Sequence, residues 1–311
     1  MIAWLVLLQA SLTIAVAGPA TSPEYLPLHV AQAEGLFTAQ QLTVTLRSVR
    51  SEAGAAEMLR ARQAPLAATS LDAALRLASV DGQPPRLVWG LTAASPVALL
   101  VNSARTASIR SPADLVGQTI AVPAPGTAED QALGLLLARA GVPMHRVTVR
   151  SLGERGALRA LESGEVAAAV LAEPYVSRLL AEGKGTVAVD LRTAKDAAAA
   201  LGGATVSAGL FARAGAPLEA VTLRALAAAL QAALDRVVST APAALEPGLP
   251  AAVIGSSADF AVRLRGARDL FLAGGRVSVE TLERSLELVQ SRAPLPAKVK
   301  LPRRAESLLL Q

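Results

Sequence analysis

A short strand-like segment occurs twice in this chain, about a hundred residues apart. Val44–Val49 reads VTLRSV and Val147–Leu152 reads VTVRSL. Each copy precedes a glycine-containing loop, an amphipathic helix, a short alanine-rich strand and a second helix that begins near an acidic residue. The repeat is too long for a solenoid, whose units span about 20 to 50 residues. The sequence therefore predicts an α/β fold with two similar lobes, each a small sheet with helices on its faces.

The expected order of strands and helices includes two chain crossings between these lobes. The chain leaves the first lobe near Ser95 and returns near Thr205. Residues 12–95 and 205–311 are expected to form a discontinuous lobe 1, and residues 96–204 to form lobe 2. Two crossings make a two-strand hinge with a ligand cleft between the lobes.

Hydrophobic periodicity and turn residues give the expected element bounds. Strands are expected at residues 12–17, 42–48, 65–69, 86–91, 97–101, 119–122, 147–152, 166–171, 186–189 and 203–213. The longest helices are expected at 218–238 and 279–292, the second with Ser278 as its N-cap.

The first eleven residues, MIAWLVLLQAS, are uncharged and mostly apolar. They resemble the apolar part of a secretion signal but lack its basic start, so the signal is expected to be truncated in this sequence. The uncharged run reaches Pro23, which is nearly long enough to span a bilayer. We favour a first strand at residues 12–17 over an anchor, and we expect a periplasmic protein.

Composition excludes several classes of function. The 311 residues contain no cysteine, which rules out disulfides and thiolate catalysis. The two histidines, His29 and His145, are not in a metal-ligand spacing, and we expect neither a metal nor a cofactor. The net charge of +5 is spread along helices without aromatic interleaving, so no nucleic-acid partner is expected. Aromatic residues are only 3%, which leaves few rings to stack on a ligand.

The stretch from Gln118 to Gly141 reads as a strand, a tight loop and a helix. Thr127 is the expected N-cap, and Asp130 completes a capping-box pattern. A helix N-terminus just past a strand end suits a small anion, because its N–H groups and dipole point the same way. An ordinary β–α turn is the alternative interpretation.

Other ligand candidates are loop residues at the carboxyl ends of strands, where open α/β sheets bind ligands. Each of them is also explained as a turn or cap residue. The candidates are Ser22, Thr69, Ser70, Thr92, Ser95, Gly126, Thr127, Glu173 and Thr205.

Glu173, Pro174 and Tyr175 follow an expected strand. Glu173 is either an acid at a helix N-terminus or a carboxylate that faces the cleft, where it accepts ligand N–H groups or pairs with a cation. Tyr175 is one of two tyrosines in the chain and is a candidate for the same pocket.

Three blocks, in this order and spacing, resemble the type II periplasmic binding proteins of ABC importers, in the branch of nitrate, sulfonate, taurine and thiamine-precursor receptors. They are LPLHVAQAEGLFTAQQLTVTL (26–46), IRSPADLVGQTIAVPAPGTAEDQALGLLLARAGV (109–142) and ALRALESGEVAAAVLAEPYVSRLL (157–180). The resemblance covers about residues 12–213 and places Gly126 and Thr127 in the ligand loop, Ser70 after the third strand and Glu173 at an acidic turn. The first loop, PATSPEY, carries little basic or aromatic content.

The resemblance implies a monomeric receptor that encloses a small organic or inorganic solute and delivers it to a membrane permease with its ATPase. The solute would be a sulfonate, nitrate, taurine or a pyrimidine. An enzyme on the same fold is the alternative, because menaquinone-pathway and pyrimidine-pathway enzymes are similar in outline. The two histidines offer little acid–base chemistry for it. A ligand-sensing module is disfavoured because no DNA-binding or signalling segment is present.

Overall fold

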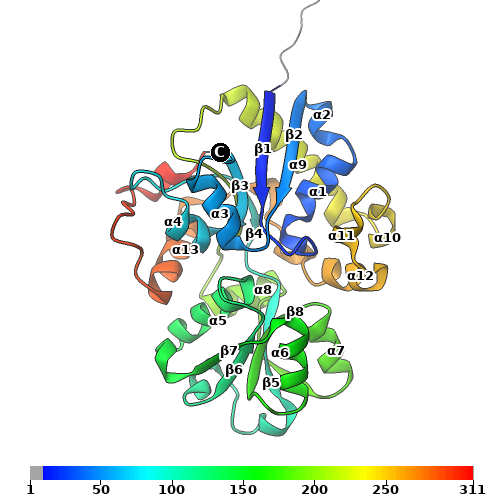
Figure 1. Ribbon diagram of the computed structural model, residues 1–311, viewed down its shortest axis with the longest axis vertical. Coiled ribbons are helices and arrows are strands. Elements are labelled where there is room, and N and C mark those ends of the chain that lie inside the picture. Colours follow the sequence, from blue (N-terminus) through cyan, green and yellow to red (C-terminus); the bar gives the residue numbers. More distant parts are fainter. Residues whose placement is uncertain (1–9, 311) are drawn as a thin grey trace, which may run out of the picture.

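A computed structural model describes residues 10–310. The chain forms two α/β lobes that are stacked along the long axis of the molecule (Figure 1). Each lobe contains one five-stranded sheet with helices packed on it. Residues 1–9 of the signal-like segment lie outside the described residues. Ala10 and Ser11, which the sequence assigned to that segment, belong to the first strand.

The lobe 1 sheet has the strand order β2-β1-β3-β10-β4. Strands β1, β2 and β3 are parallel, whereas β10 is antiparallel to both of its neighbours. Its strands are β1 (Ala10–Val16), β2 (Leu42–Ser48), β3 (Leu66–Ser70), β4 (Arg86–Thr92) and β10 (Ala208–Ala212).

The lobe 2 sheet has the order β7-β6-β8-β5-β9 and repeats the pattern of lobe 1. Its single antiparallel insertion is β5, between β8 and β9. The two copies of the sequence repeat fall on the equivalent edge strands β2 and β7, which accounts for their similarity. The strands are β5 (Val97–Asn102), β6 (Thr119–Val122), β7 (Thr148–Ser151), β8 (Ala168–Ala172) and β9 (Gly185–Asp190).

Helices connect these strands and cover both sheets (Figure 1). In lobe 1 before the first crossing they are α1 (Leu26–Ala33), α2 (Leu36–Ala39), α3 (Glu52–Arg60) and α4 (Leu71–Leu77). Lobe 2 contains α5 (Ala128–Arg139), α6 (Gly153–Glu162), α7 (Tyr175–Ala181) and α8 (Ala194–Leu201). The chain then adds α9 (Ala220–Ser239), α10 (Pro242–Leu245), α11 (Ala251–Ile254), α12 (Ser257–Arg265) and α13 (Val279–Arg292) to lobe 1.

The sequence placed most elements within two residues of these bounds, and β2, β6 and α13 agree with it at both ends. The largest difference is β10, which begins five residues later than expected. Residues 203–207 instead form the return crossing, where Thr205 Oγ1 donates to Ala93 O over 2.7 Å. The expected strand was too long because the hinge segment is also apolar and extended.

The two crossings form a hydrogen-bonded hinge. Ser207 N donates to Thr92 O at 2.8 Å, and the hydroxyls of Ser95 and Ser207 lie 3.1 Å apart. The two segments are therefore tied side by side where the chain passes between the lobes.

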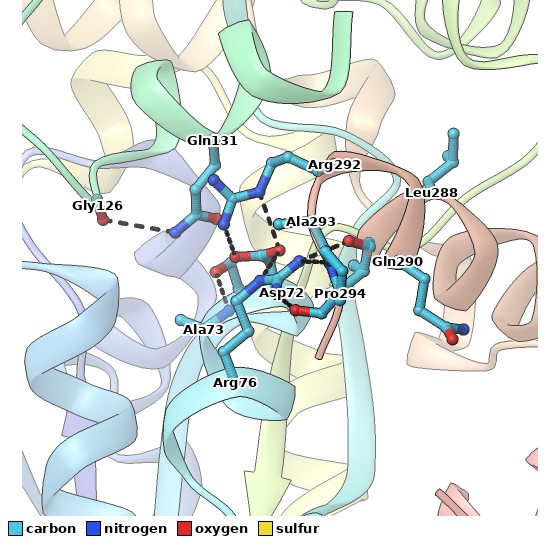
Figure 2. A network of polar contacts seen from close by, with 12 residues as sticks. Asp72, Ala73, Arg76, Gly126, Gln131, Leu288, Gln290, Arg292, Ala293 and Pro294 are labelled. Atoms are coloured by element: carbon cyan, nitrogen blue, oxygen red, sulfur yellow. Dashed lines mark hydrogen bonds and ion pairs between the residues drawn. The ribbon is translucent and has the colours of Figure 1, made fainter. Parts of the chain in front are cut away.

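Behind the hinge, α13 of lobe 1 packs on α5 of lobe 2. Asp72 holds α13 in place: it accepts from Arg76 Nε at 2.9 Å and from Arg292 Nη2 at 2.6 Å (Figure 2). A Cβ on Gly134 would lie 2.7 Å from Arg292 Cδ, so glycine permits this close approach of the two helices.

The lobe 1 core is one continuous cluster around its sheet, and lobe 2 has one cluster on each face of its own. Tyr25, Ile14 and Phe211 are among the largest fully buried side chains. Alanine fills many of the strand positions, so the helices can pack close to both sheets. Within residues 10–310, no helix combines the length and the apolar character that a bilayer crossing requires.

Candidate functional site

A cleft lies between the lobes, open to solvent and lined by residues of both. We call it the interlobe cleft. Lobe 1 lines it with the loop of residues 18–24, with Glu52 and with Arg263. Lobe 2 lines it with residues 127–129, Glu154, Ala172 and Glu173, and the hinge adds Pro96 and Val97. The charged residues of this lining are five glutamates and one arginine.

Glu52 is the first residue of α3, after the N-cap Ser51. Its carboxylate accepts from the Tyr25 hydroxyl at 2.7 and 2.8 Å, from Thr69 Oγ1 at 2.9 Å and from Ser70 N at 2.6 Å. Burial raises the pKa of Glu52, and the three donors work in the opposite direction because they bind the ionised form. The result is a buried carboxylate in one fixed orientation.

Glu24 lies in the turn Pro23–Tyr25 that opens α1 and is only 5% exposed. Within the described part of the chain, its own backbone N–H is the single hydrogen-bond donor that acts on the carboxyl. Burial raises the pKa of Glu24 to about 8, and the charges of Glu52 and Glu129 raise it further. Because Glu129 belongs to the opposite lobe, Glu24 faces across the cleft.

Glu129 occupies the first turn of α5 and is 9% exposed. Burial raises its pKa to about 6, while hydrogen bonds from its own backbone and from Thr127 hold the value down. The charges of Glu154 and Glu52 contribute to the increase. Carboxyl groups from both lobes therefore interact through the cleft.

The N-terminus of α5 has the predicted cap. The Thr127 side chain accepts from Asp130 N, and the Asp130 carboxylate accepts from Gly126 N at 2.9 Å. Two acids, Glu129 and Asp130, follow the cap in the first turn. The helix end that the sequence assigned to a small anion already carries carboxylates of its own.

Glu173 combines features of both of its proposed roles. It accepts from Ser177 N at 3.0 Å and from Ser177 Oγ at 2.9 Å in the first turn of α7, and it forms an ion pair with Arg192. It also lines the cleft. Its charge is thus neutralised within lobe 2.

Arg263 of α12 is the one cation among the lining residues. Its Nη2 donates to Ile254 O at 2.6 Å and to Val253 O at 3.4 Å, and burial lowers its pKa. Within residues 10–310 it forms no ion pair shorter than 4 Å. Glu154, in the first turn of α6, accepts instead from the Tyr175 hydroxyl at 3.2 Å.

The structure distributes the ten predicted site residues over three places. The cleft lining includes Ser22, Thr127 and Glu173. Ser70, Ser95 and Thr205 line a second cavity behind the hinge, beside α5 and α13. The remaining four are Thr69, Thr92, Gly126 and Tyr175, which lie outside both linings.

Three of these four still act on neighbours of the cleft. Thr69 donates to Glu52, Gly126 donates to Asp130, and Tyr175 donates to Glu154. Thr92 is completely buried, and its hydroxyl has no hydrogen-bond partner within the described residues. Tyr175 was expected in the pocket but supports a lining residue from outside, because its ring packs at 5.9 Å from Arg178 instead.

Sequence reasoning missed Glu24, Glu52, Glu129, Glu154 and Arg263. The four glutamates share one signal, since each lies in the first turn of a helix or 3-10 turn that follows a strand. An acid at such a position is sufficiently explained by its favourable interaction with the helix dipole, so it does not by itself indicate a ligand site. Arg263 lies beyond residue 213, where the resemblance to a known family ended.

The carboxyl groups of this lining can accept hydrogen bonds from a ligand. The lining residues include no histidine, cysteine or aromatic side chain. His29 is buried, with its pKa lowered to about 4 by burial, and lies outside the lining. Within residues 10–310, no group of three histidine or acidic side chains has the geometry of a metal site.

Solved structures share this two-lobed fold. A protein from Bordetella bronchiseptica RB50 matches at 24% identity and a TM-score of 0.76, with 96% of each chain covered. The alkanesulfonate-binding protein SsuA from Xanthomonas axonopodis pv. citri, bound to MOPS, matches at 20% identity and a TM-score of 0.69, over 96% of this chain and 98% of that one. The periplasmic nitrate-binding protein NrtA from Synechocystis PCC 6803 matches at 12% identity and a TM-score of 0.56, over 86% and 72%.

No curated protein matches the chain in sequence. A family model described as NMT1/THI5 like matches residues 22–238, which is more than half of the chain. This match agrees with the three sequence blocks that indicated periplasmic solute receptors, and the shared fold agrees with the predicted pair of lobes. The chain therefore belongs to the NMT1/THI5-like family and has the fold of the periplasmic binding proteins.

Proposed function

We propose that this protein is the solute-binding receptor of an ABC-type importer. It encloses a small solute between its lobes in the periplasm and delivers it to a membrane permease with its ATPase. The observation that carries this proposal is the interlobe cleft, because its lining comes from both lobes and from the hinge. A solute in contact with both lobes favours the closed arrangement by its differential affinity, as ligand-driven domain closure requires.

The similar structures support the proposal. SsuA from Xanthomonas is named as alkanesulfonate-binding and NrtA from Synechocystis as periplasmic and nitrate-binding. The present chain covers almost all of the first and most of the second. In this proposal the receptor encloses and releases its solute without catalysis. A single chain supplies both sides of the cleft, so one monomer is sufficient for the proposed binding.

The test is a thermal-unfolding screen of the full chain against sulfonates, nitrate, carboxylates, amines and pyrimidines. A bound solute at a hundred times its dissociation constant adds about 2.7 kcal/mol to the free energy of unfolding. Small-angle X-ray scattering should then show a smaller radius of gyration when the solute is bound. The receptor function is wrong if no solute changes either quantity while a candidate substrate is chemically converted.

A further inference from the structure

We infer that the solute is an organic cation that presents N–H donors, such as an alkylammonium, amidinium or guanidinium group. The inference rests on the receptor function proposed above and specifies the chemistry of its ligand. The interlobe cleft supplies acceptors and negative charge from both lobes, and its one arginine already donates to backbone carbonyls.

Few of the carboxyl groups in the cleft have a cationic partner within the part of the protein that the structure describes. Of the five lining glutamates, Glu173 has a cationic partner in Arg192. Glu52 accepts from neutral donors, none of which supplies a positive charge. Within residues 10–310, Glu24, Glu129 and Glu154 form no ion pair. Glu24 and Glu129 are buried. Buried carboxylates are normally paired, and a cationic ligand would supply the missing partner of these two.

Glu24 gives the independent indication of a ligand. Glu24 is 5% exposed and lines the cleft. Among residues 10–310, its own backbone N–H is the one donor to its carboxyl group. Polar groups this deeply buried have hydrogen-bond partners in the great majority of proteins. A donor on a solute in the cleft would complete the contacts of this carboxyl.

The carboxyl groups also lie on opposite sides of the interlobe cleft. Glu24 and Glu52 belong to lobe 1, whereas Glu129 and Glu154 belong to lobe 2. The charge of Glu129 acts on Glu24, and the charge of Glu52 acts on Glu129. A cation between the lobes favours the ionised form of these carboxyl groups and attracts those on both sides. Binding and closure are thereby coupled.

The type of cation follows from the groups that are missing in the lining. It contains no aromatic ring, so a quaternary ammonium would find none of the ring faces that recognise it. Within residues 10–310, no cluster of three or more acidic or histidine side chains is arranged to hold a metal ion. N–H groups can pair with carboxylates directly, and those of guanidinium can do so in a bidentate manner.

An anion fits this cleft less well. Asp130 accepts from Gly126 N at the α5 N-terminus, and Glu129 stands in the same turn. Nη2 of Arg263 donates to two carbonyls. A sulfonate would therefore meet carboxylates where the fold could have offered free donors.

The experiment compares ligands that differ only in the charged end group: butylammonium and butylguanidinium against butanesulfonate, with tetramethylammonium and Ca²⁺ as further probes. Isothermal titration and thermal unfolding of the full chain should detect the two N–H cations and not the other three. Cation binding at pH 7 should also release protons, because Glu24 is largely protonated in the empty cleft, with a pKa of about 8. Titration in two buffers of different ionisation enthalpy measures this release.

Glu24→Gln should weaken binding of the N–H cations by about tenfold or more, since a hydrogen bond to a charged group is lost, and should reduce the proton release. Glu280→Gln removes the same charge at a side chain that is 81% exposed, outside the cleft lining, and should bind as wild type does. Unfolding curves without ligand confirm that both variants fold.

Binding of butanesulfonate in preference to the cations overturns the inference but leaves the receptor function intact. Preference for tetramethylammonium or Ca²⁺, or no binding of either N–H cation to the folded protein, overturns it as well. The receptor function fails separately if a cation binds with proton release but the radius of gyration stays that of the free protein.

Discussion

The Tyr25 hydroxyl lies 2.7 Å from Oε1 and 2.8 Å from Oε2 of Glu52, and both side chains are almost fully buried. The phenol thus donates to a carboxylate at the start of α3, one residue after the helix N-cap. This contact joins the turn that carries Glu24 to the helix that carries Glu52. It fixes the distance between two acids of the cleft.

Tyr25→Phe should destabilise the protein by about 1.5 to 3 kcal/mol, the usual value of a hydrogen bond to a charged group. Urea unfolding at pH 7 measures the change. Tyr175→Phe is the matched control, because its hydroxyl reaches the exposed Glu154 at 3.2 Å. We expect the control to stay within about 0.5 kcal/mol of wild type. Equal losses in both variants would contradict a special role of the buried contact.

Glu24 should make the ligand-free protein less stable as pH rises. Its pKa is about 8 when folded against a reference of 4.5, so the folded state binds more protons between these values. Its contribution is fully present below pH 4.5 and is lost as the pH rises to about 8. The slope approaches about 1.4 kcal/mol per pH unit. Glu129, whose pKa is about 6, adds to the loss at the acid end of the window.

Glu24→Gln should flatten the decline between pH 6.5 and 8, and unfolding curves across this range measure it. Glu280→Gln should retain the wild-type slope. If the stability of Glu24→Gln still fell with pH as that of wild type does, the decline would come from another titratable group.

His29 should have the opposite effect on the acid side. Burial lowers its pKa from 6.5 to about 4, so the unfolded state binds the proton first as pH falls. Stability from this residue is complete above pH 6.5 and is lost toward pH 4. His29→Gln should therefore approach the stability of wild type as the solution is acidified. His145→Gln, at an exposed position, is the matched control. If this control showed the same pH trend, the effect could not be attributed to the burial of His29.

Arg292→Lys should cost about 1 to 3 kcal/mol of stability, because lysine cannot reproduce the two-point contact with the buried Asp72. Arg292 Nε and Nη2 lie 3.2 and 2.6 Å from the two carboxylate oxygens (Figure 2). On the same helix, Arg284 pairs with the exposed Glu280, and Arg284→Lys should cost less than about 1 kcal/mol. Chemical unfolding compares the two. Equal costs would show that the Asp72 contact contributes little.

Much of the fold could be predicted from the sequence because its signals are local. The alternation in Leu42–Ser48 gave β2, and Thr127 and Ser278 identified the starts of α5 and α13. The repeated motif gave two lobes because equivalent edge strands need similar residues in equivalent sheets. Residues 203–207 were misread as strand because extended hinge backbone and strand have the same local pattern.

The cleft was harder to predict, because its chemistry depends on which helix starts face each other. Glu52 and Glu129 each have a sufficient local explanation as first-turn acids. Only the packing of the lobes shows that Glu129 acts on Glu24 through the cleft. Arg263 joins them from a late helix whose sequence gave no indication of the site.

The position of β10 has a consequence for biogenesis. This strand lies between β3 and β4, so the lobe 1 sheet has a gap until residues 208–212 leave the ribosome. Lobe 2 strands β5 to β9 form one continuous segment and can pair before then. Until then, β3 and β4 each expose an unpaired strand edge in lobe 1. Unpaired strand edges can pair with other chains and so promote aggregation. A chaperone that shields β3 and β4 would be needed longest for this half of the molecule.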